Sequence, residues 1–199
     1  MKLSGKIYRS ILLLIGCFSF FVNTQAQNWD INLLKKINPQ NPNSSIMRGF
    51  TNSSYPIGIA APLSLLAAGY IKKDKHLKYK GWEAAGSLAI AAIITEGLKH
   101  TINRDRPYIK YPNKIYPNSI ENDPSFPSGH ASVAFATATT LTLEFKKWYV
   151  AVPAYAWAAG IGYSRMYLGQ HYPTDIIGSA VVGSGSALLS HWLNKKIFK

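Results

Sequence analysis

The chain has 199 residues, a length that suits one domain with one sizeable core. Only 16% of the residues are charged and 47% are hydrophobic, yet the formal net charge is +13, which fits nucleic acid, a membrane surface or membrane topology signals. The single cysteine, Cys17, lies close to the N-terminus. This position excludes an internal disulfide framework, and also a cysteine metal site in the body of the protein.

The N-terminus has the pattern of an export signal. The basic start MKLSGKIYRS is followed by the apolar stretch ILLLIGCFSFFV and then by the small residue Ala26. We expect residues 1–26 to be a signal peptide, or an uncleaved first membrane helix, and residues 27–199 to form one helical domain. A third interpretation takes LIGC as a lipoprotein box with a lipid on Cys17. All three send the chain into or across a membrane.

Five further stretches carry almost no charge and are rich in alanine, glycine and serine. They are residues 49–71, 84–95, 131–143, 148–164 and 176–194. Such composition favours helices that pack closely, so we expect an all-α bundle of five to six helices with an active site at one end. Some stretches are shorter than the roughly 20 residues that cross a bilayer. A soluble bundle with an alanine-rich core therefore remains an alternative to a membrane-embedded one.

Lysines between these stretches favour the membrane. Basic clusters occur at 72–80, at 146–147 and at 195–199. If successive helices alternate in direction, all three clusters lie on one side, as the positive-inside rule requires. The connections after Leu98 and after Tyr163 then lie on the opposite, outer side. No zinc-finger or helix-turn-helix pattern accompanies the basic charge, so nucleic acid is not an expected partner.

The two outer connections hold the residues that could bind a ligand or take part in catalysis. Three cations without matching carboxylates predict an anionic ligand with several oxygens, and phosphate fits the fork of arginine and the point charge of lysine. Each of these residues taken alone also has a purely structural interpretation, as a charge on a loop, a turn residue or a structural histidine. Their joint placement on one side carries the prediction. The candidate residues are Lys99, Arg106, Ser128, Gly129, His130, Arg165, His171 and Asp175.

The sequence also assigns roles within this set. Ser128 is a good N-cap, and Gly129 allows a ligand to approach the free N–H groups at a helix start. His171 and Asp175 are four residues apart, so one helical turn can bring them together, with the aspartate fixing the tautomer of a nucleophilic imidazole. His130 is then available as a general acid.

Three spaced motifs carry a family resemblance. The chain has a lysine, six residues and Arg-Pro; then Pro-Ser-Gly-His; then Ser-Arg, five residues, His, three residues and Asp. In this order and spacing it resembles the type 2 phosphatidic acid phosphatase and vanadium haloperoxidase superfamily. The motif residues are Lys99, Arg106, Pro107, Pro127 to His130, Ser164, Arg165, His171 and Asp175.

The resemblance implies a phosphatase that needs no metal and no cofactor. His171 would form a phosphohistidine, Asp175 would orient it, and His130 would protonate the leaving oxygen and later activate water. The phosphate oxygens would be held by Lys99, Arg106, Ser128, Gly129 and Arg165.

For bacterial membrane members the resemblance also implies six membrane helices in the inner membrane and an active site facing the periplasm. A lipid phosphate is then the expected substrate, of the undecaprenyl diphosphate, phosphatidate, phosphatidylglycerol phosphate or lipid A class. The alternatives are a periplasmic broad-range acid phosphatase, a vanadium-dependent haloperoxidase and a non-enzymatic membrane protein. The sequence indicates no oligomeric state.

Overall fold

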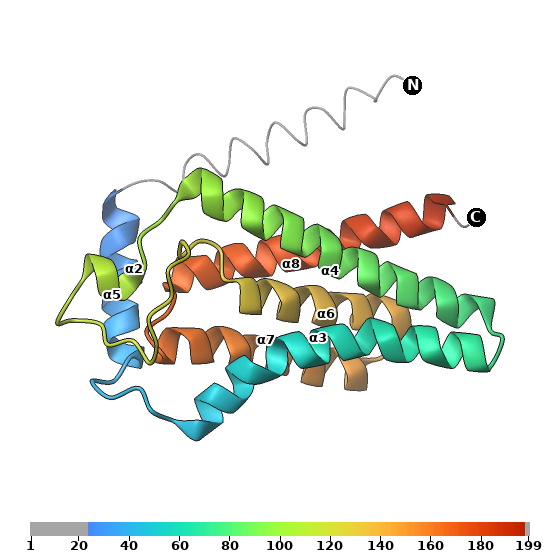
Figure 1. Ribbon diagram of the computed structural model, residues 1–199, viewed down its shortest axis with the longest axis horizontal. Helices are drawn as coiled ribbons and strands as arrows, with labels where there is room; N and C mark the ends of the chain where they lie inside the picture. Colours follow the sequence, from blue (N-terminus) through green and yellow to red (C-terminus); the bar gives the residue numbers. More distant parts are fainter. Residues whose placement is uncertain (1–23, 198–199) are drawn as a thin grey trace, which may run out of the picture.

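The computed structural model describes residues 24–197, with side chains from Trp29 onward. Of the predicted leader at residues 1–26, residues 1–23 lie outside the described residues, as does the lipid expected on Cys17, and residues 24–26 belong to the first described helix. Throughout the described range the regular structure is helical, as the sequence predicts (Figure 1). The helices are α2 (Thr24–Ile37), α3 (Ser45–Ile71), α4 (Lys75–Ile102), α5 (Pro107–Lys110), α6 (Gly129–Phe145), α7 (Trp148–Tyr167) and α8 (Pro173–Ile197).

The five long helices run side by side, and α2 and α5 lie together at one end of them (Figure 1). Helix α6 packs against α3, α4, α7 and α8, so it is the centre of the bundle. Small residues permit this packing, because a Cβ atom on Gly183 of α8 would lie 2.4 Å from the Ser132 carbonyl oxygen of α6. Ala134, Ala138 and Ala158 are fully buried between α6 and α7.

Local signals fix where the helices begin and end. The Asp74 side chain accepts from the backbone N–H groups of His76 and Leu77 and caps α4, while Ser44 caps α3. Helix α4 ends at Ile102, and its C-cap Asn103 has the left-handed conformation at φ 46°. Because α4 starts inside the lysine run, it has 28 residues and is much longer than its apolar stretch at 84–95.

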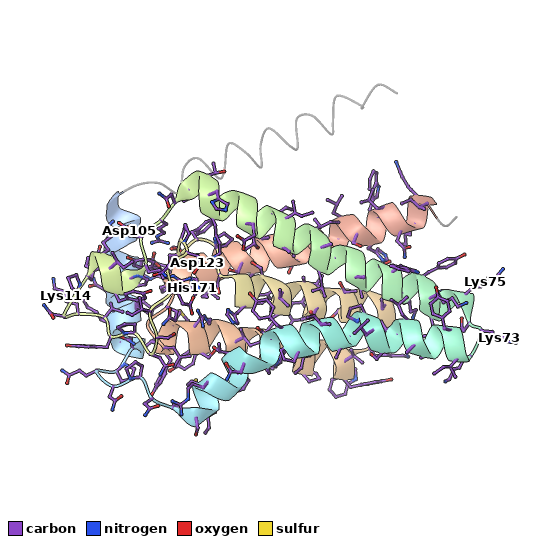
Figure 2. The ribbon with its side chains drawn as sticks, in the orientation of Figure 1. Lys73, Lys75, Asp105, Lys114, Asp123 and His171 are labelled. Carbon is purple, nitrogen blue, oxygen red and sulfur yellow. The ribbon has the colours of Figure 1, made fainter. Side chains whose placement is uncertain are left out.

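One end of the bundle carries the lysine run that precedes and starts α4, and it is called the basic end below. Lys73 and Lys75 lie at the end opposite His171 and Asp123, as the alternating topology predicts (Figure 2). Helices α3 and α8 are long and apolar enough to cross a membrane by length and composition. The outer faces of the bundle expose large apolar side chains, including Leu63, Ile93, Val152 and Leu188.

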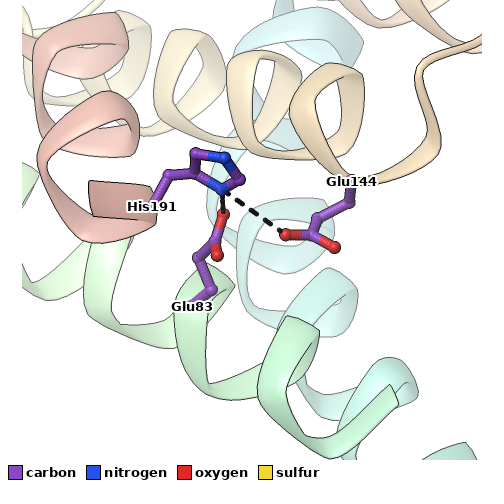
Figure 3. Close-up of side chains that lie close together, drawn as sticks. All are labelled: Glu83, Glu144 and His191. Atoms are coloured by element: carbon purple, nitrogen blue, oxygen red, sulfur yellow. Dashed lines mark hydrogen bonds and ion pairs between the residues drawn. The ribbon is translucent and has the colours of Figure 1, made fainter. Parts of the chain in front are cut away.

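A buried polar group joins three helices near the basic end (Figure 3). Nδ1 of His191 lies 2.7 Å from a Glu83 oxygen and 3.9 Å from a Glu144 oxygen. These three residue types could hold a metal ion, since their ligand atoms lie within 4.8 Å of one another. Lys80 Nζ lies 3.5 Å from the Glu144 carboxylate and supplies a positive charge there. The chain thus provides its own counter-ions, and the group fastens α4, α6 and α8 together.

Helix α2 closes the other end of the bundle, an element the sequence did not predict. Its residues Ile31 and Leu34 are buried in a cluster with Tyr108, Ile115 and Tyr172. Asn38, directly after α2, donates to the carbonyl oxygens of Tyr116 and Tyr167 at 2.9 and 2.8 Å. The helix therefore braces the connections that carry the candidate site.

Candidate active site

The fold brings the three motifs together at the end of the bundle that α2 braces. Lys99 lies in the last turn of α4, and Arg106 precedes α5. Ser128, Gly129 and His130 start α6, Arg165 lies in the last turn of α7, and His171 and Asp175 flank the start of α8.

His171 is held with one ring nitrogen bonded and the other directed at a cation. Its Nδ1 lies 2.7 Å from the Ser125 carbonyl oxygen, which can only accept, so Nδ1 carries the proton. Nε2 is then unprotonated, and its lone pair accepts from Nη1 of Arg106 at 3.5 Å. Burial, followed by the charges of Arg165, Arg106 and Lys99, lowers the pKa of His171 well below its ordinary value. A neutral ring with an unprotonated Nε2 is the form that can act as a nucleophile.

Asp175 lies beside His171, although the two do not share a helix. Helix α8 begins at Pro173, so His171 precedes it and Asp175 lies in its first turn. The carboxylate is 3.5 Å from His171 Nδ1, farther than the Ser125 carbonyl oxygen that bonds the ring. Asp175 Oδ2 accepts from the backbone N–H of Tyr172 at 2.9 Å and from the Ser125 hydroxyl. Asp175 therefore positions the segments on both sides of the imidazole, and Ser125 is an orienting residue that the sequence did not reveal.

Arg104 is a second residue that the sequence analysis missed. Its guanidinium donates to Asp175 Oδ1 at 2.5 Å and to Asp30 Oδ2 of α2 at 2.7 Å. It also lies over the Tyr172 ring, 3.8 Å from the centroid. The arginine therefore links α2 to the first turn of α8 directly behind His171.

Three buried cations surround the open side of His171. They are Lys99, Arg106 and Arg165. The expectation that they lack matching carboxylates is wrong, because Glu121 and Asp123 of the 111–128 connection fold over them. The sequence could not show this, since the acids lie in an irregular loop without periodicity. Nε of Arg165 is buried and has no hydrogen-bond partner among the described residues.

The start of α6 completes the site. Ser128 is the N-cap, as the sequence predicts, and its side chain accepts from Ala131 N–H. A Cβ atom on Gly129 would lie 3.0 Å from the Tyr55 hydroxyl, which shows how close α3 approaches here. The His130 ring meets Tyr55 edge-on, with centroids 4.7 Å apart. It is close enough to Arg165 for that charge to act on it.

With this geometry established, the comparison with known sequences decides the family. The sequence model of the PAP2 superfamily matches residues 80–199, which include every motif residue. The chain belongs to the PAP2 superfamily.

Relatives of this PAP2 protein include lipid phosphatases. It is 30% identical over 152 residues to a lipid A 1-phosphatase of Porphyromonas gingivalis, covering 74% of this chain and 31% of that protein. It is 34% identical over 114 residues to an undecaprenyl-diphosphatase of Sulfolobus acidocaldarius, covering 52% and 50%. The chain therefore spans about a third to a half of the length of these relatives.

A solved structure shares the fold. The transmembrane PAP2-type phosphatidylglycerolphosphate phosphatase of Bacillus subtilis superimposes with a TM-score of 0.73 at 21% identity, covering 94% of both chains. At this identity the likeness supports the helical architecture alone.

Proposed function

We propose that this PAP2 protein is a phosphatase that removes phosphate from a lipid phosphate or diphosphate through a phosphohistidine. The observation that carries the proposal is the state of His171. Its ring is buried and oriented by Ser125, and its unprotonated Nε2 faces Arg106. Lys99 and Arg165 lie close enough for their charges to act on the same ring. This combination suits attack on phosphorus while cations stabilise the charge that develops on the phosphate oxygens.

The chemical steps follow from this arrangement. His171 Nε2 attacks phosphorus, and the bond between phosphorus and the leaving oxygen breaks. His130 gives its proton to that oxygen, so the leaving group departs as an alcohol or a phosphate. In the second step His130 takes a proton from water, whose oxygen attacks phosphorus and breaks the P–N bond. Inorganic phosphate leaves, and His171 is neutral again.

The surroundings of the site support a lipid substrate. The long helices next to it expose apolar side chains, and α3 and α8 are long enough to cross a membrane. Acyl or prenyl chains can therefore lie beside the bundle while the phosphate enters its end. We propose that the protein lies in the inner membrane with the site facing the periplasm, because Lys73 and Lys75 of the lysine run at the start of α4 lie at the opposite end. The relatives named for undecaprenyl diphosphate and lipid A favour these two head groups within the lipid class.

The test is a phosphate-release assay on the purified protein in mixed micelles. The panel holds undecaprenyl diphosphate, lipid A, phosphatidate, phosphatidylglycerol phosphate and the soluble ester p-nitrophenyl phosphate. We expect at least one lipid to have a higher kcat/KM than the soluble ester. Equal hydrolysis of soluble esters and every lipid would instead indicate a broad-range acid phosphatase. Halide oxidation with vanadate and peroxide, without phosphate release, would indicate a haloperoxidase.

A further inference from the structure

The proposed nucleophile and phosphate-binding cations are covered in this structure. His171 and Arg106 are each 1% exposed. The side chains that pair with Arg106 are Glu121 and Asp123, which are 28% and 52% exposed. These two residues are called the acidic pair below. A substrate phosphate cannot touch the cations until the acidic pair moves.

The carboxylates of the acidic pair make the contacts that a phosphate would make. Glu121 accepts from Nη2 of Arg165 with one oxygen and pairs with Nη2 of Arg106 with the other, both at 2.7 Å. Asp123 accepts from Arg106 at 2.7 Å with Oδ1 and from Lys99 with Oδ2. Four carboxylate oxygens thus serve three cations. Charge-assisted pairs of this kind are strong, and arginine binds carboxylate and phosphate with the same fork.

We propose that Glu121 and Asp123 are an internal competitor for the phosphate site and set its affinity for substrate and for product phosphate. The inference rests on the proposed phosphatase function. An incoming phosphate exchanges its oxygens for those of the acidic pair, and the pair returns when product phosphate leaves. The residues therefore weaken phosphate binding and speed product release.

The attachment of the loop fits such an exchange. The Tyr108 hydroxyl donates to the Glu121 carbonyl oxygen at 2.8 Å and accepts from the Glu121 N–H at 2.9 Å. Ser125 N–H donates to the Arg104 carbonyl oxygen at 2.8 Å. Between these anchors, the carbonyl oxygens of Asp123 and Pro124 are held by Arg106 and Lys99. The segment between the anchors is therefore fixed largely by the same cations that phosphate would engage.

The acidic pair stays charged over the working pH range. Burial raises the pKa of Asp123, but bonds from Lys99 and Arg106 outweigh it and bring the pKa to about 2. Burial raises the pKa of Glu121, but the contacts with Arg165 and Arg106 together outweigh burial. The pKa of Glu121 is therefore also lowered. Competition with phosphate is therefore permanent and is not relieved by mild acid.

The first experiment compares inhibition constants in isosteric variants. Glu121→Gln and Asp123→Asn, singly and together, keep the side-chain volume and remove the negative charge. We expect the Ki for inorganic phosphate to fall about tenfold in the double variant, because a competing charge-assisted pair is lost. The matched control is Asp105→Asn, which removes an exposed acid at the same end and should leave Ki within about twofold. An unchanged or higher Ki in the double variant would overturn the proposal.

The second experiment uses the wild-type protein and needs no folded variant. Hydrogen exchange of the backbone amides of Asn122 and Asp123, which lie between the two anchors, is measured with and without orthovanadate. Because vanadate should take Lys99 and Arg106 away from the loop carbonyl groups, exchange there should become faster. Slower exchange would show that the loop closes on the anion and would refute the competition.

The two hypotheses fail in different ways. If the wild-type protein hydrolyses a lipid phosphate but neither phosphate affinity nor loop exchange changes as expected, only the competitor is wrong. If the wild-type protein neither hydrolyses any phosphate ester nor binds phosphate or vanadate, the proposed function itself is wrong.

Discussion

Losing Arg104 should strongly destabilise the protein behind His171, the proposed nucleophile. Its guanidinium joins Asp175 and Asp30, whose side chains are 0% and 2% exposed. In Arg104→Met both carboxylates would lose their cation and stay buried. Removing one partner of a buried ion pair costs about 3–5 kcal/mol, so we expect a loss of roughly that size in the free energy of unfolding.

The measurement is denaturant unfolding in detergent micelles, followed by tryptophan fluorescence. Adding Asp30→Asn to Arg104→Met should recover about 1–2 kcal/mol, since one unpaired charge disappears. Lys114→Met, at an exposed lysine at the same end, should change stability by less than about 0.5 kcal/mol. A loss below about 1 kcal/mol in Arg104→Met, or no recovery in the double variant, would refute this account of the pairing.

Three further outcomes are expected. His171→Ala should abolish turnover and the phosphoenzyme together, whereas Asp175→Asn should slow turnover strongly; a phosphoenzyme trapped in the alanine variant would exclude His171 as nucleophile. Burial and neighbouring cations hold the pKa of His171 well below its ordinary 6.5, so the imidazole stays neutral at pH 6.5. Protonation of His171 should therefore lower kcat/KM only at more acidic pH. A decline in kcat/KM caused by this group and centred at or above pH 6.5 would contradict this expectation. For the orientation, single cysteines are placed at Asn118 or at Lys75 in a protein from which Cys17 has been removed. On intact cells a membrane-impermeant thiol reagent should label the cysteine at Asn118 and leave the one at Lys75 unlabelled. Equal labelling would contradict the proposed orientation.

The sequence predicts most of what lies inside the motifs. The apolar stretches rich in small residues correctly predict a helical bundle. The motif spacing from Lys99 to Asp175 predicts a set of residues that the fold gathers at one end of that bundle. Capping chemistry placed the start of α6 correctly at Ser128, because an N-cap is a local signal.

What escaped prediction depends on contacts between distant segments. Arg104 lies inside the spacer of the first motif, and only the fold shows that it reaches Asp30, 74 positions away. Glu121 and Asp123 lie in an irregular connection whose path no periodicity describes. Glu83 and Glu144 look like isolated charges on two helices until His191 joins them from a third.

The contact between α6 and α8 has a consequence for engineering. The Ser179 hydroxyl accepts from Ser128 N–H at 2.8 Å and lies 3.0 Å from the carbonyl oxygen of Ser128, and Gly183 brings the two backbones together one turn further on. The helix that carries His130 is thereby held to the helix that follows His171 by contacts that do not involve residues 111–124. New head-group preferences should therefore be obtainable by exchanging residues 111–124 for those of other family members, with Ser125, α6 and α8 retained.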